Sequence, residues 1–239
     1  MYFGQALLII AVLTTISTSA YGCGRPEAIT PPSAATATPT PINLQSLLAQ
    51  SGRAMESLES FHFRLEHKAG GTPILPILVI DSAEGDVVKP DKVSSEFSGL
   101  FGQLVIKSSQ ITVGPSTYIT NPLSGQWEHV PVEISPMGFF NPSRGIADVM
   151  SRIEQPSLLR HTQKMYRISG TLPAEALTSL FGATTKETRV AVELSIDARS
   201  LYLLEATING RVTPTEPDGT IRIITFSRFN QPASIASPL

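Results

Sequence analysis

Residues that could carry chemistry are few in this chain, and their spacing matches no common catalytic or metal-binding motif. Cys23 is the only cysteine among 239 residues, so it can form neither an intramolecular disulfide nor, by itself, a zinc site. No His-Glu-x-x-His sequence occurs, and the histidines are scattered as His62, His67, His129 and His161. The pattern therefore predicts neither a metal site nor a bound cofactor.

Two acidic pairs could in principle act as an acid and a base. Glu84 and Asp86 flank a glycine, and Glu216 and Asp218 flank a proline, so both pairs are predicted to lie in solvated turns. The Gly99–Gly102 segment is predicted to be a hairpin turn, and no nucleophile elbow, phosphate-binding loop or dinucleotide fingerprint is present. We therefore do not expect an enzyme, although a catalytic pair built from distant residues stays an alternative.

The segment before Cys23 has the features of an export signal. Its apolar core from Ala6 to Ile16 is too short for a membrane-spanning helix, which needs about 20 residues. Ala20, Gly22 and Cys23 resemble the lipobox of bacterial lipoproteins, although the lipobox usually has leucine where Ala20 stands. That resemblance implies a signal peptide over 1–22, a diacylglyceryl and palmitate anchor on Cys23, and a position on the outer face of the cell membrane. The alternative is an ordinary signal peptide with an incidental cysteine nearby.

Residues 23–42 read as a tether, because they are rich in Pro, Thr, Ala and Ser and lack the apolar residues needed for a core. The formal net charge of the chain is −2, charged residues make up 16%, and no run of like charges occurs. This composition excludes nucleic acid as an expected partner and gives no electrostatic attraction to an anionic membrane. Any attachment to a membrane therefore needs another cause, and the lipid anchor implied for Cys23 would supply one.

A folded domain is predicted over 43–230, followed by a short tail at 231–239. Apolar residues at helical spacing predict a helix from Leu44 to Ser60, capped by Asn43. Further helices are predicted over 141–153 and 173–181. Alternating segments predict strands near 61–65, 77–82, 93–97, 104–113, 117–120, 126–130, 165–170, 188–197, 200–212 and 220–229. The sum is an α+β fold with one dominant antiparallel sheet of about ten strands.

The alternation also predicts which side chains face the core. On the strand over 188–197, Val190, Val192, Leu194 and Ile196 alternate with polar residues, and the same parity on the next strand selects Tyr202, Leu204, Ala206 and Ile208. On the first strand, Phe61 and Phe63 set the apolar face, so His62 and His67 are expected to be solvated. Trp127 is expected to pair with Tyr118 across a hairpin.

Several of these segments together resemble one family, the LppX/LprAFG lipoproteins. The resemblance rests on Cys23, the Pro/Thr tether, the helix running into Ser57–Phe63, the Ile111–Ile119 segment and Trp127. It implies the LolA/LolB-like architecture: a curved antiparallel half-barrel whose helices close over an apolar cavity. In that case the eight core-facing residues of the two C-terminal strands line the cavity, and a monomer binds and transfers a long-chain lipid or acylated glycolipid.

Two rival functions use the same elements. One is an envelope sensor or interaction module that binds a protein partner, for which we expect a pocket too small for an acyl chain and an exposed apolar patch or open strand edge. The other is an exported hydrolase with dispersed catalytic residues. Cavity volume separates them, because ligand sites commonly measure roughly 300 to 1,000 Å³.

Overall fold

The computed structural model describes residues 42–75, 77–131, 145–181 and 184–239, which fall within the compact unit that begins at Pro41. Its helices are α1 (Leu44–Glu56), α2 (Gly145–Ser151), the 3₁₀ helix η2 (Ala174–Leu177) and α3 (Thr178–Phe181). Its strands are β1 (Ser60–Ala69), β2 (Thr72–Leu75), β3 (Leu78–Val88), β4 (Lys92–Phe101), β5 (Leu104–Val113), β6 (Ser116–Thr120), β7 (Trp127–Val130), β8 (Glu154–His161), β9 (Met165–Pro173), β10 (Arg189–Asp197), β11 (Leu203–Asn209) and β12 (Ile221–Ser227).

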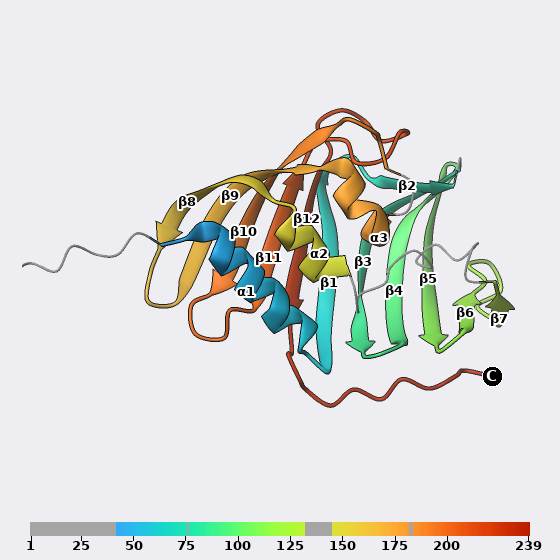
Figure 1. The fold of residues 1–239 in the computed structure, drawn as a ribbon. Coiled ribbons are helices and arrows are strands. Elements are labelled where there is room, and N and C mark those ends of the chain that lie inside the picture. The colour runs from blue at the N-terminus through green and yellow to red at the C-terminus, as the bar shows by residue number, and fades with distance from the viewer. Residues whose placement is uncertain (1–41, 76, 132–144, 182–183) are drawn as a thin grey trace, which may run out of the picture. The chain divides into compact units, whose positions relative to one another are not determined.

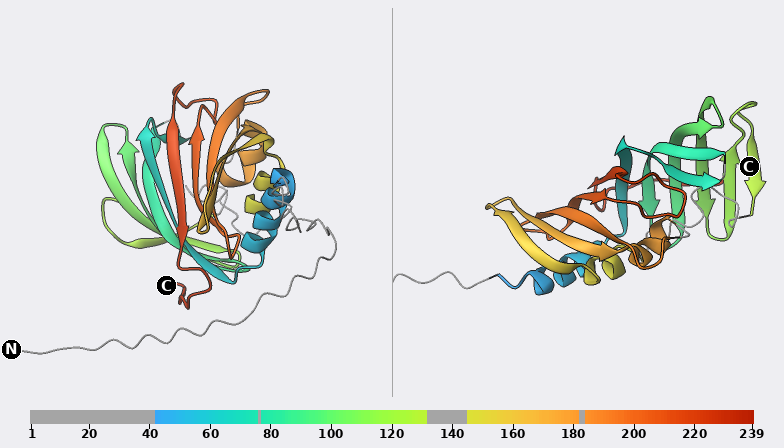
Figure 2. Two further views of the ribbon diagram at one scale, coloured as in Figure 1. Left: turned by 90° about the vertical axis from the view of Figure 1, so that its left-hand side faces the viewer. Right: turned by 90° about the horizontal axis from the view of Figure 1, so that it is seen from above.

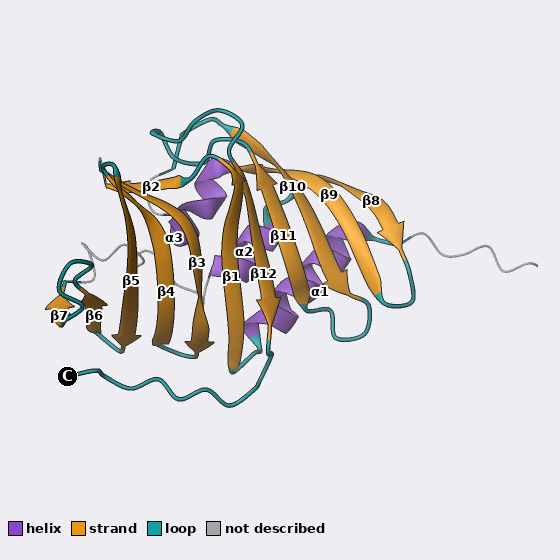
Figure 3. Ribbon diagram, turned by 180° about the vertical axis from the view of Figure 1, so that it is seen from behind, coloured by secondary structure: helices purple, strands orange, loops and turns teal. Residues whose placement is uncertain are grey.

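The strands form one open antiparallel sheet in the order β7-β6-β5-β4-β3-β1-β12-β11-β10-β9-β8, and β2 pairs with β3 (Figure 3). The N-terminal and C-terminal halves of the chain meet where β1 pairs with β12. The predicted α+β class with one curved antiparallel sheet is confirmed. The described residues contribute twelve strands where about ten were predicted. The two that sequence analysis missed are β2, which contains Pro73, and β8, which contains Pro156.

The helices lie together on one face of this sheet, the inward and concave face (Figures 1 and 2). In Figure 1, α1 crosses in front of the strands from β9 to β1, α2 lies beside it, and α3 lies near the upper end of β3. The core fills the space between these helices and the inward rows of the strands. The C-terminal strands, which carry the predicted core-facing residues, thus lie directly under the helical layer.

Helix α1 forms because its apolar residues recur on one face and because its first turn is capped. The Asn43 side chain accepts a hydrogen bond from the backbone N–H of Ser46 at 3.0 Å. Leu47, Leu48 and Met55 are buried on the side that meets the sheet. The helix ends at Glu56, four residues before the predicted end at Ser60, because Ser60 already belongs to β1.

Gly52 lies where α1 crosses α2. A Cβ atom at Gly52 would lie 3.1 Å from the Cα of Ala147, which is tighter than most real contacts. The glycine weakens the helix locally but permits the close approach of the two helices. Helices α1 and α2 therefore pack closely against each other.

Lys89 ties the C-terminal end of α1 to the sheet. Its Nζ donates hydrogen bonds to the carbonyl oxygens of Met55 at 3.0 Å and Glu56 at 2.6 Å. Burial lowers the pKa of this lysine, and the nearby Glu56 opposes that shift. The ammonium group lies where the helix carbonyls lack partners and where the helix dipole favours a cation.

Replacing Lys89 with Met is expected to lower the free energy of unfolding by about 1–2 kcal/mol, because two helix carbonyls lose a charged donor. Urea unfolding followed by circular dichroism measures the loss. Lys164→Met is the control, since Lys164 is exposed. Equal stability of the Lys89→Met variant and the parent chain would show that this attachment contributes nothing.

Two predictions about local structure are wrong. Glu84, Gly85 and Asp86 do not form a turn but lie within β3, where a Cβ on Gly85 would come within 2.1 Å of the Ser94 carbonyl oxygen. Glycine often marks a turn, but here it permits a close approach between two strands. Trp127 does not pair with Tyr118 either: it lies opposite Thr120, and Tyr118 packs edge-on against His129 with ring centroids 5.3 Å apart.

Among the described residues, β7 and β8 are the two edge strands of the sheet. Strand β7 has four residues, and the pairing of β8 with β9 is interrupted by two register shifts. Short and irregular edge strands are a common means of preventing edge-to-edge association. Strand β8 nevertheless exposes Leu158 and Leu159.

The residues after β12 continue along the start of β1. The backbone N–H of Asn230 donates to the carbonyl oxygen of Ser60, and the Ser60 hydroxyl donates to the carbonyl oxygen of Gln231. Ile235 is buried. The segment predicted as a tail, 231–239, is thus docked on the domain at least as far as Ile235.

Candidate functional site

The inward row of β10 is buried beneath the helices. Val190, Val192, Leu194 and Ile196 all belong to the hydrophobic core, and the intervening residues Ala191 and Glu193 are exposed. Strand β10 lies between β9 and β11, so its inward side chains have neighbours from both sides. The alternation in the sequence located this row.

The alternation fails on β11, where the pairing with β10 shifts. Ser195 pairs with Glu205 but Ile196 pairs with Leu203, so Leu204 is an extra residue in the strand. After this irregularity, Leu203 takes the buried position on the inward row, and Tyr202 and Leu204 are only partly buried. A bulge of this kind leaves no mark in a two-residue alternation. Ala206 and Ile208 lie on the other side of the bulge, where the predicted alternation holds, and both are buried as expected.

An apolar void of about 40 Å³ lies between the inward rows and the helices. The sheet contributes Val192, Leu194, Leu203, Ala206 and Ile208 among others. The helices close it with residues such as Ile146, Met150 and Leu180. No polar side chain lines it, so the enclosed space offers a ligand only apolar contact.

The first inward-facing residue of β12 is charged. Arg222 shares its face with Ile224 and Phe226, two residues that line the void, yet its side chain is fully buried. Its Nη2 lies 2.7 Å from Oε2 of Glu216, which is also fully buried. The prediction that Glu216 is solvated is therefore wrong, whereas Asp218 is 90% exposed.

Glu216 also holds the loop that precedes β12. Its Oε2 accepts hydrogen bonds from the backbone N–H groups of Val212 at 2.6 Å and Thr213 at 3.2 Å. The guanidinium of Arg222 stacks on the Phe181 ring, 4.7 Å from its centroid. Burial lowers the pKa of Arg222, and Glu216 opposes that shift. The ion pair joins the loop, α3 and the sheet at the upper end of the inward face.

His67 lies beside this ion pair, because it pairs with Arg222 across β1 and β12. Its Nδ1–H donates to the carbonyl oxygen of Asp81 at 2.7 Å, and its Nε2 lies 3.0 Å from the Thr72 hydroxyl. Burial lowers its pKa, the Asp81 carbonyl opposes the shift, and the charge of Arg222 lowers the pKa further. His67 is thus a partly buried, neutral histidine and not the solvated one predicted.

The position of His67 predicts a pH dependence. Its folded-state pKa lies below the ordinary value of 6.5, so the unfolded chain takes up a proton first as the pH falls. Stability is then complete above about pH 6.5 and declines below it, by at most about 1.4 kcal/mol per pH unit. His67→Asn keeps a donor for Asp81, and we expect it to flatten this slope in urea titrations between pH 5 and 7. The exposed His129→Gln control should keep the slope, and an unchanged slope in His67→Asn would contradict the assignment.

His62, also predicted to be solvated, lies on the outward face but is only 15% exposed. Its Nδ1 lies 2.8 Å from Oδ1 of Asp86. Asp86 is therefore part of a surface polar cluster on β3 and not of a turn. Nη2 of Arg228 donates to the same His62 nitrogen at 2.6 Å and lies 3.9 Å from Oδ1 of Asp86, so these three side chains form one polar network on the surface.

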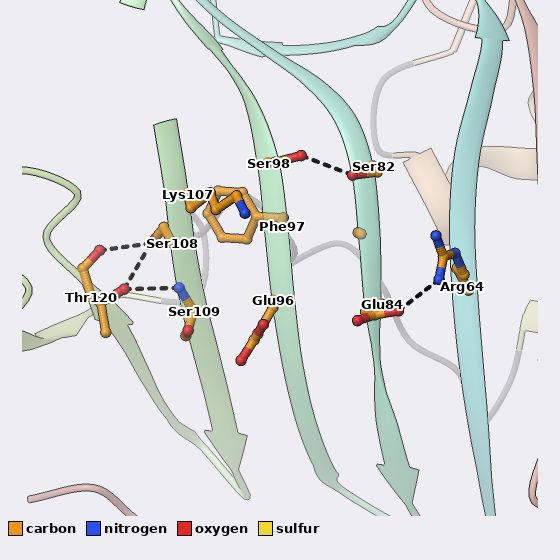
Figure 4. Close-up of a pocket in the computed structure, with 11 residues that line it drawn as sticks. Arg64, Ser82, Glu84, Glu96, Phe97, Ser98, Lys107, Ser108, Ser109 and Thr120 are labelled. Atoms are coloured by element: carbon orange, nitrogen blue, oxygen red, sulfur yellow. Dashed lines mark hydrogen bonds and ion pairs between the residues drawn. The ribbon is translucent and has the colours of Figure 1, made fainter. Parts of the chain in front are cut away.

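The outward face also carries a shallow depression of about 310 Å³ across β1, β3, β4 and β5 (Figure 4). Arg64 and Glu84 form an exposed ion pair at one side, with Nη1 and Oε2 3.4 Å apart. Glu96, Lys107 and several serine residues also line the depression. Its mixed charges and open walls give no enclosed site for an apolar ligand.

Three remaining observations bear on the predicted site residues. Cys23 lies outside the described residues. Within the described ranges, no three His, Cys, Asp or Glu side chains come together as a metal site. None of the helices in those ranges has the length and apolar character needed to cross a bilayer.

Comparison with known proteins places this arrangement in a family. The sequence pattern of the LppX_LprAFG lipoproteins matches residues 43–234. LprF from Mycobacterium bovis superposes with a TM-score of 0.61 and 19% identity, covering 82% of this chain and 96% of LprF. Lipoprotein LppX from Mycobacterium tuberculosis superposes with a TM-score of 0.57 and 18% identity, covering 81% of this chain and 98% of LppX. A sequence search of curated proteins found no match. The match over 43–234 is nevertheless long enough to assign the chain: it belongs to the LppX_LprAFG lipoprotein family.

Proposed function

We propose that this protein is a membrane-anchored lipoprotein that binds long-chain lipids or acylated glycolipids between its concave sheet and its helices, and transfers them. Cys23 carries the diacylglyceryl anchor on the extracytoplasmic face of the cell membrane, and residues 24–42 tether the domain to it. The domain acts as a monomeric binding protein and not as an enzyme.

The observation that carries this proposal is the apolar void roofed by α2, η2 and α3. Its lining is wholly apolar and includes four residues that the alternation selects in the sequence: Val192, Leu194, Ala206 and Ile208. Transfer of an acyl chain from water to such surroundings is favourable by about 0.8 kcal/mol per buried CH₂. The family membership of residues 43–234 points to the same class of protein.

The size of the void sets a condition on binding. At about 40 Å³ it is far smaller than the roughly 300 Å³ at which ligand sites commonly begin. An acyl chain therefore needs the helical layer to move away from the sheet. We infer that the described form is the closed one and that lipid displaces the helices from the inward rows of β10 and β11.

A substitution inside the void tests this proposal. Ala206→Leu adds three carbons where the void lies, and we expect it to weaken binding of a fluorescent C16 lipid to the Cys23→Ser chain by at least tenfold. Ala191→Leu is the matched control, because Ala191 lies on the outward face of β10 and is exposed. Equal affinity of the two variants would reject the void as the binding site. Thermal unfolding monitors the expected overpacking penalty of about 1–3 kcal/mol.

The small volume of the void also favours a second candidate function, a module that binds a protein partner. Such a module needs no cavity for an acyl chain, and in the described part of the chain β7 and β8 are edge strands of the sheet. If the C16 lipid fails to bind the parent chain at any concentration, this candidate replaces the first. A saturable lipid complex with one lipid per chain rejects it as the main function.

A further inference from the structure

The guanidinium of Arg222 is buried without a hydrogen bond. Its side chain is fully buried. Within the described part of the chain, Nε, Nη1 and Nη2 make no hydrogen bond of acceptable geometry, although Nη2 lies 2.7 Å from Oε2 of Glu216. A guanidinium has five N–H groups, and buried polar groups nearly always have a hydrogen-bond partner. The donors of Arg222 are therefore available to an acceptor oxygen from another molecule.

The loop beside Arg222 carries further polar atoms that are buried and unpaired. Oε1 of Glu216 has no hydrogen-bond partner among the described residues, although Oε2 accepts from the backbone N–H groups of Val212 and Thr213. The Thr213 hydroxyl is also buried without a partner in that part of the chain. Free donors on Arg222 thus lie next to a free acceptor on Glu216. A hydroxyl group both accepts and donates hydrogen bonds, so it can satisfy the two side chains together.

These polar atoms adjoin the apolar void. Arg222 shares the inward row of β12 with Ile224 and pairs with Ile208 of β11, and both isoleucines line the void. Successive residues of one inward row are about 7 Å apart along a strand. A lipid whose chain occupies the void therefore brings its head group within reach of Arg222.

Helix α3 covers both the void and the guanidinium. Leu180 lines the void, and the ring centroid of Phe181 lies 4.7 Å from the central carbon of the Arg222 guanidinium. Leu180 and Phe181 are consecutive residues of one short helix. A movement of α3 that opens the void consequently uncovers Arg222 as well. The lipid that displaces the helices meets the unpaired donors in the same step.

The charges around Arg222 favour an uncharged head group. Arg222 and Glu216 form a neutral pair, and His67 opposite Arg222 adds no charge, because burial lowers its pKa. Arg211 and Asp218 on the same loop are exposed and lie 3.6 Å apart, so their charges also balance. A carboxylate or phosphate head group would place an unbalanced charge beside the buried Glu216 carboxylate. A hydroxyl group adds no charge.

We propose that Arg222 and Glu216 recognise an uncharged, hydroxyl-bearing head group on the lipid that occupies the void, and that they select against free fatty acids. The guanidinium donates to the hydroxyl oxygen, and the hydroxyl donates to Oε1 of Glu216. The inference rests on the proposed function, because it needs a lipid between the sheet and the helices. Glycerol and sugars both supply such hydroxyl groups.

Displacement of the fluorescent C16 lipid from the Cys23→Ser chain tests this selectivity. The competitors carry chains of the same length: 1-palmitoylglycerol and hexadecyl glucoside have hydroxyl groups, methyl palmitate has only an ester, and palmitate is an anion. We expect at least one hydroxyl-bearing competitor to act at about tenfold lower concentration than methyl palmitate and palmitate. A tenfold ratio corresponds to about 1.4 kcal/mol, which one hydrogen bond to a charged group can supply. The stronger of the two identifies glycerol or sugar as the source of the hydroxyl.

The double variant Glu216→Leu/Arg222→Met removes both partners of the hydroxyl. In the Cys23→Ser chain it should reduce the preference over methyl palmitate to about twofold or less, because no charged donor remains. The preference is a ratio of two affinities, so a loss of stability that lowers both affinities cancels. Glu193→Leu/Arg167→Met is the matched control. This pair, 3.0 Å apart, is exposed on the outward face, and its replacement should keep the preference.

The two proposals fail in different ways. If the fluorescent lipid does not bind the parent chain, the proposed function fails and this inference fails with it. If the lipid binds but all four competitors displace it equally, or palmitate displaces it best, the lipid site stands and recognition by Arg222 and Glu216 is overturned. A preference that the double variant retains also overturns it. The ranking of competitors in the parent chain decides the matter even if the double variant does not fold.

Discussion

Replacing Glu216 with Leu is expected to lower the free energy of unfolding by about 3–5 kcal/mol, a large part of the stability of a single domain. The substitution leaves the fully buried Arg222 without its counter-charge. It also removes the acceptor for the backbone N–H groups of Val212 and Thr213. For a chain of this size the melting temperature should fall by roughly 6–20 °C.

The double variant Glu216→Leu/Arg222→Met separates charge from packing. Because apolar replacements of buried ion pairs are often neutral or stabilising, we expect the second substitution to restore more than half of the loss. Glu193→Leu serves as the control, since Glu193 pairs with Arg167 on the exposed outward face of β10. An exposed pair should contribute less than about 1 kcal/mol. Additive effects of Glu216→Leu and Arg222→Met in urea unfolding would contradict the coupling.

Replacing Cys23 with Ser is expected to move nearly all of the protein from the membrane fraction to the soluble fraction. A diacylglyceryl group contributes two acyl chains, at about 0.8 kcal/mol per buried CH₂, so its loss removes the proposed anchor. Cell fractionation with a high-salt wash and immunoblotting measures the shift. Leu104→Ser, which leaves Cys23 intact, should stay in the membrane fraction. Retention of the Cys23→Ser chain in the membrane would argue against acylation.

The sequence predicts the strands correctly where one face of the sheet is buried and the other is exposed to solvent. Val190, Val192 and Leu194 alternate with exposed residues, so both the strand and its inward row follow from the pattern. The same rule fails on β11, because the extra residue at Leu204 arises from pairing with β10 and not from local sequence. Strand β8 was missed because it is an edge strand with little burial and therefore no strong alternation.

The buried ion pair could have been found with one further step. In β12 the alternation places Arg222 in the same row as Ile224 and Phe226, and a buried guanidinium needs a carboxylate. Glu216 is one of the two nearest candidates along the chain, but the Glu-Pro-Asp sequence was read as a turn in water. The loop is indeed a turn, and tertiary packing buries one of its two carboxylates.

The β4–β5 turn shows a different limit of prediction from sequence patterns. The sequence predicts a hairpin turn over 99–102, but residues 99–101 belong to β4, and the turn comprises Gly102 and Gln103. What the turn exposes depends on the neighbouring Ile77, which joins it through tertiary contact. The surroundings of this turn therefore follow from the arrangement of three strands and not from any one motif.

The central claim is that the concave face holds a lipid, although its closed form leaves only about 40 Å³. The most direct measurement is organic extraction and mass spectrometry of the protein purified from its own membrane. Covalently attached chains on Cys23 stay with the protein, so the extract contains only lipid that was bound non-covalently. We predict close to one long-chain lipid per protein, lost in Ala206→Leu and kept in Ala191→Leu. Protein that consistently yields no extractable lipid would contradict the account.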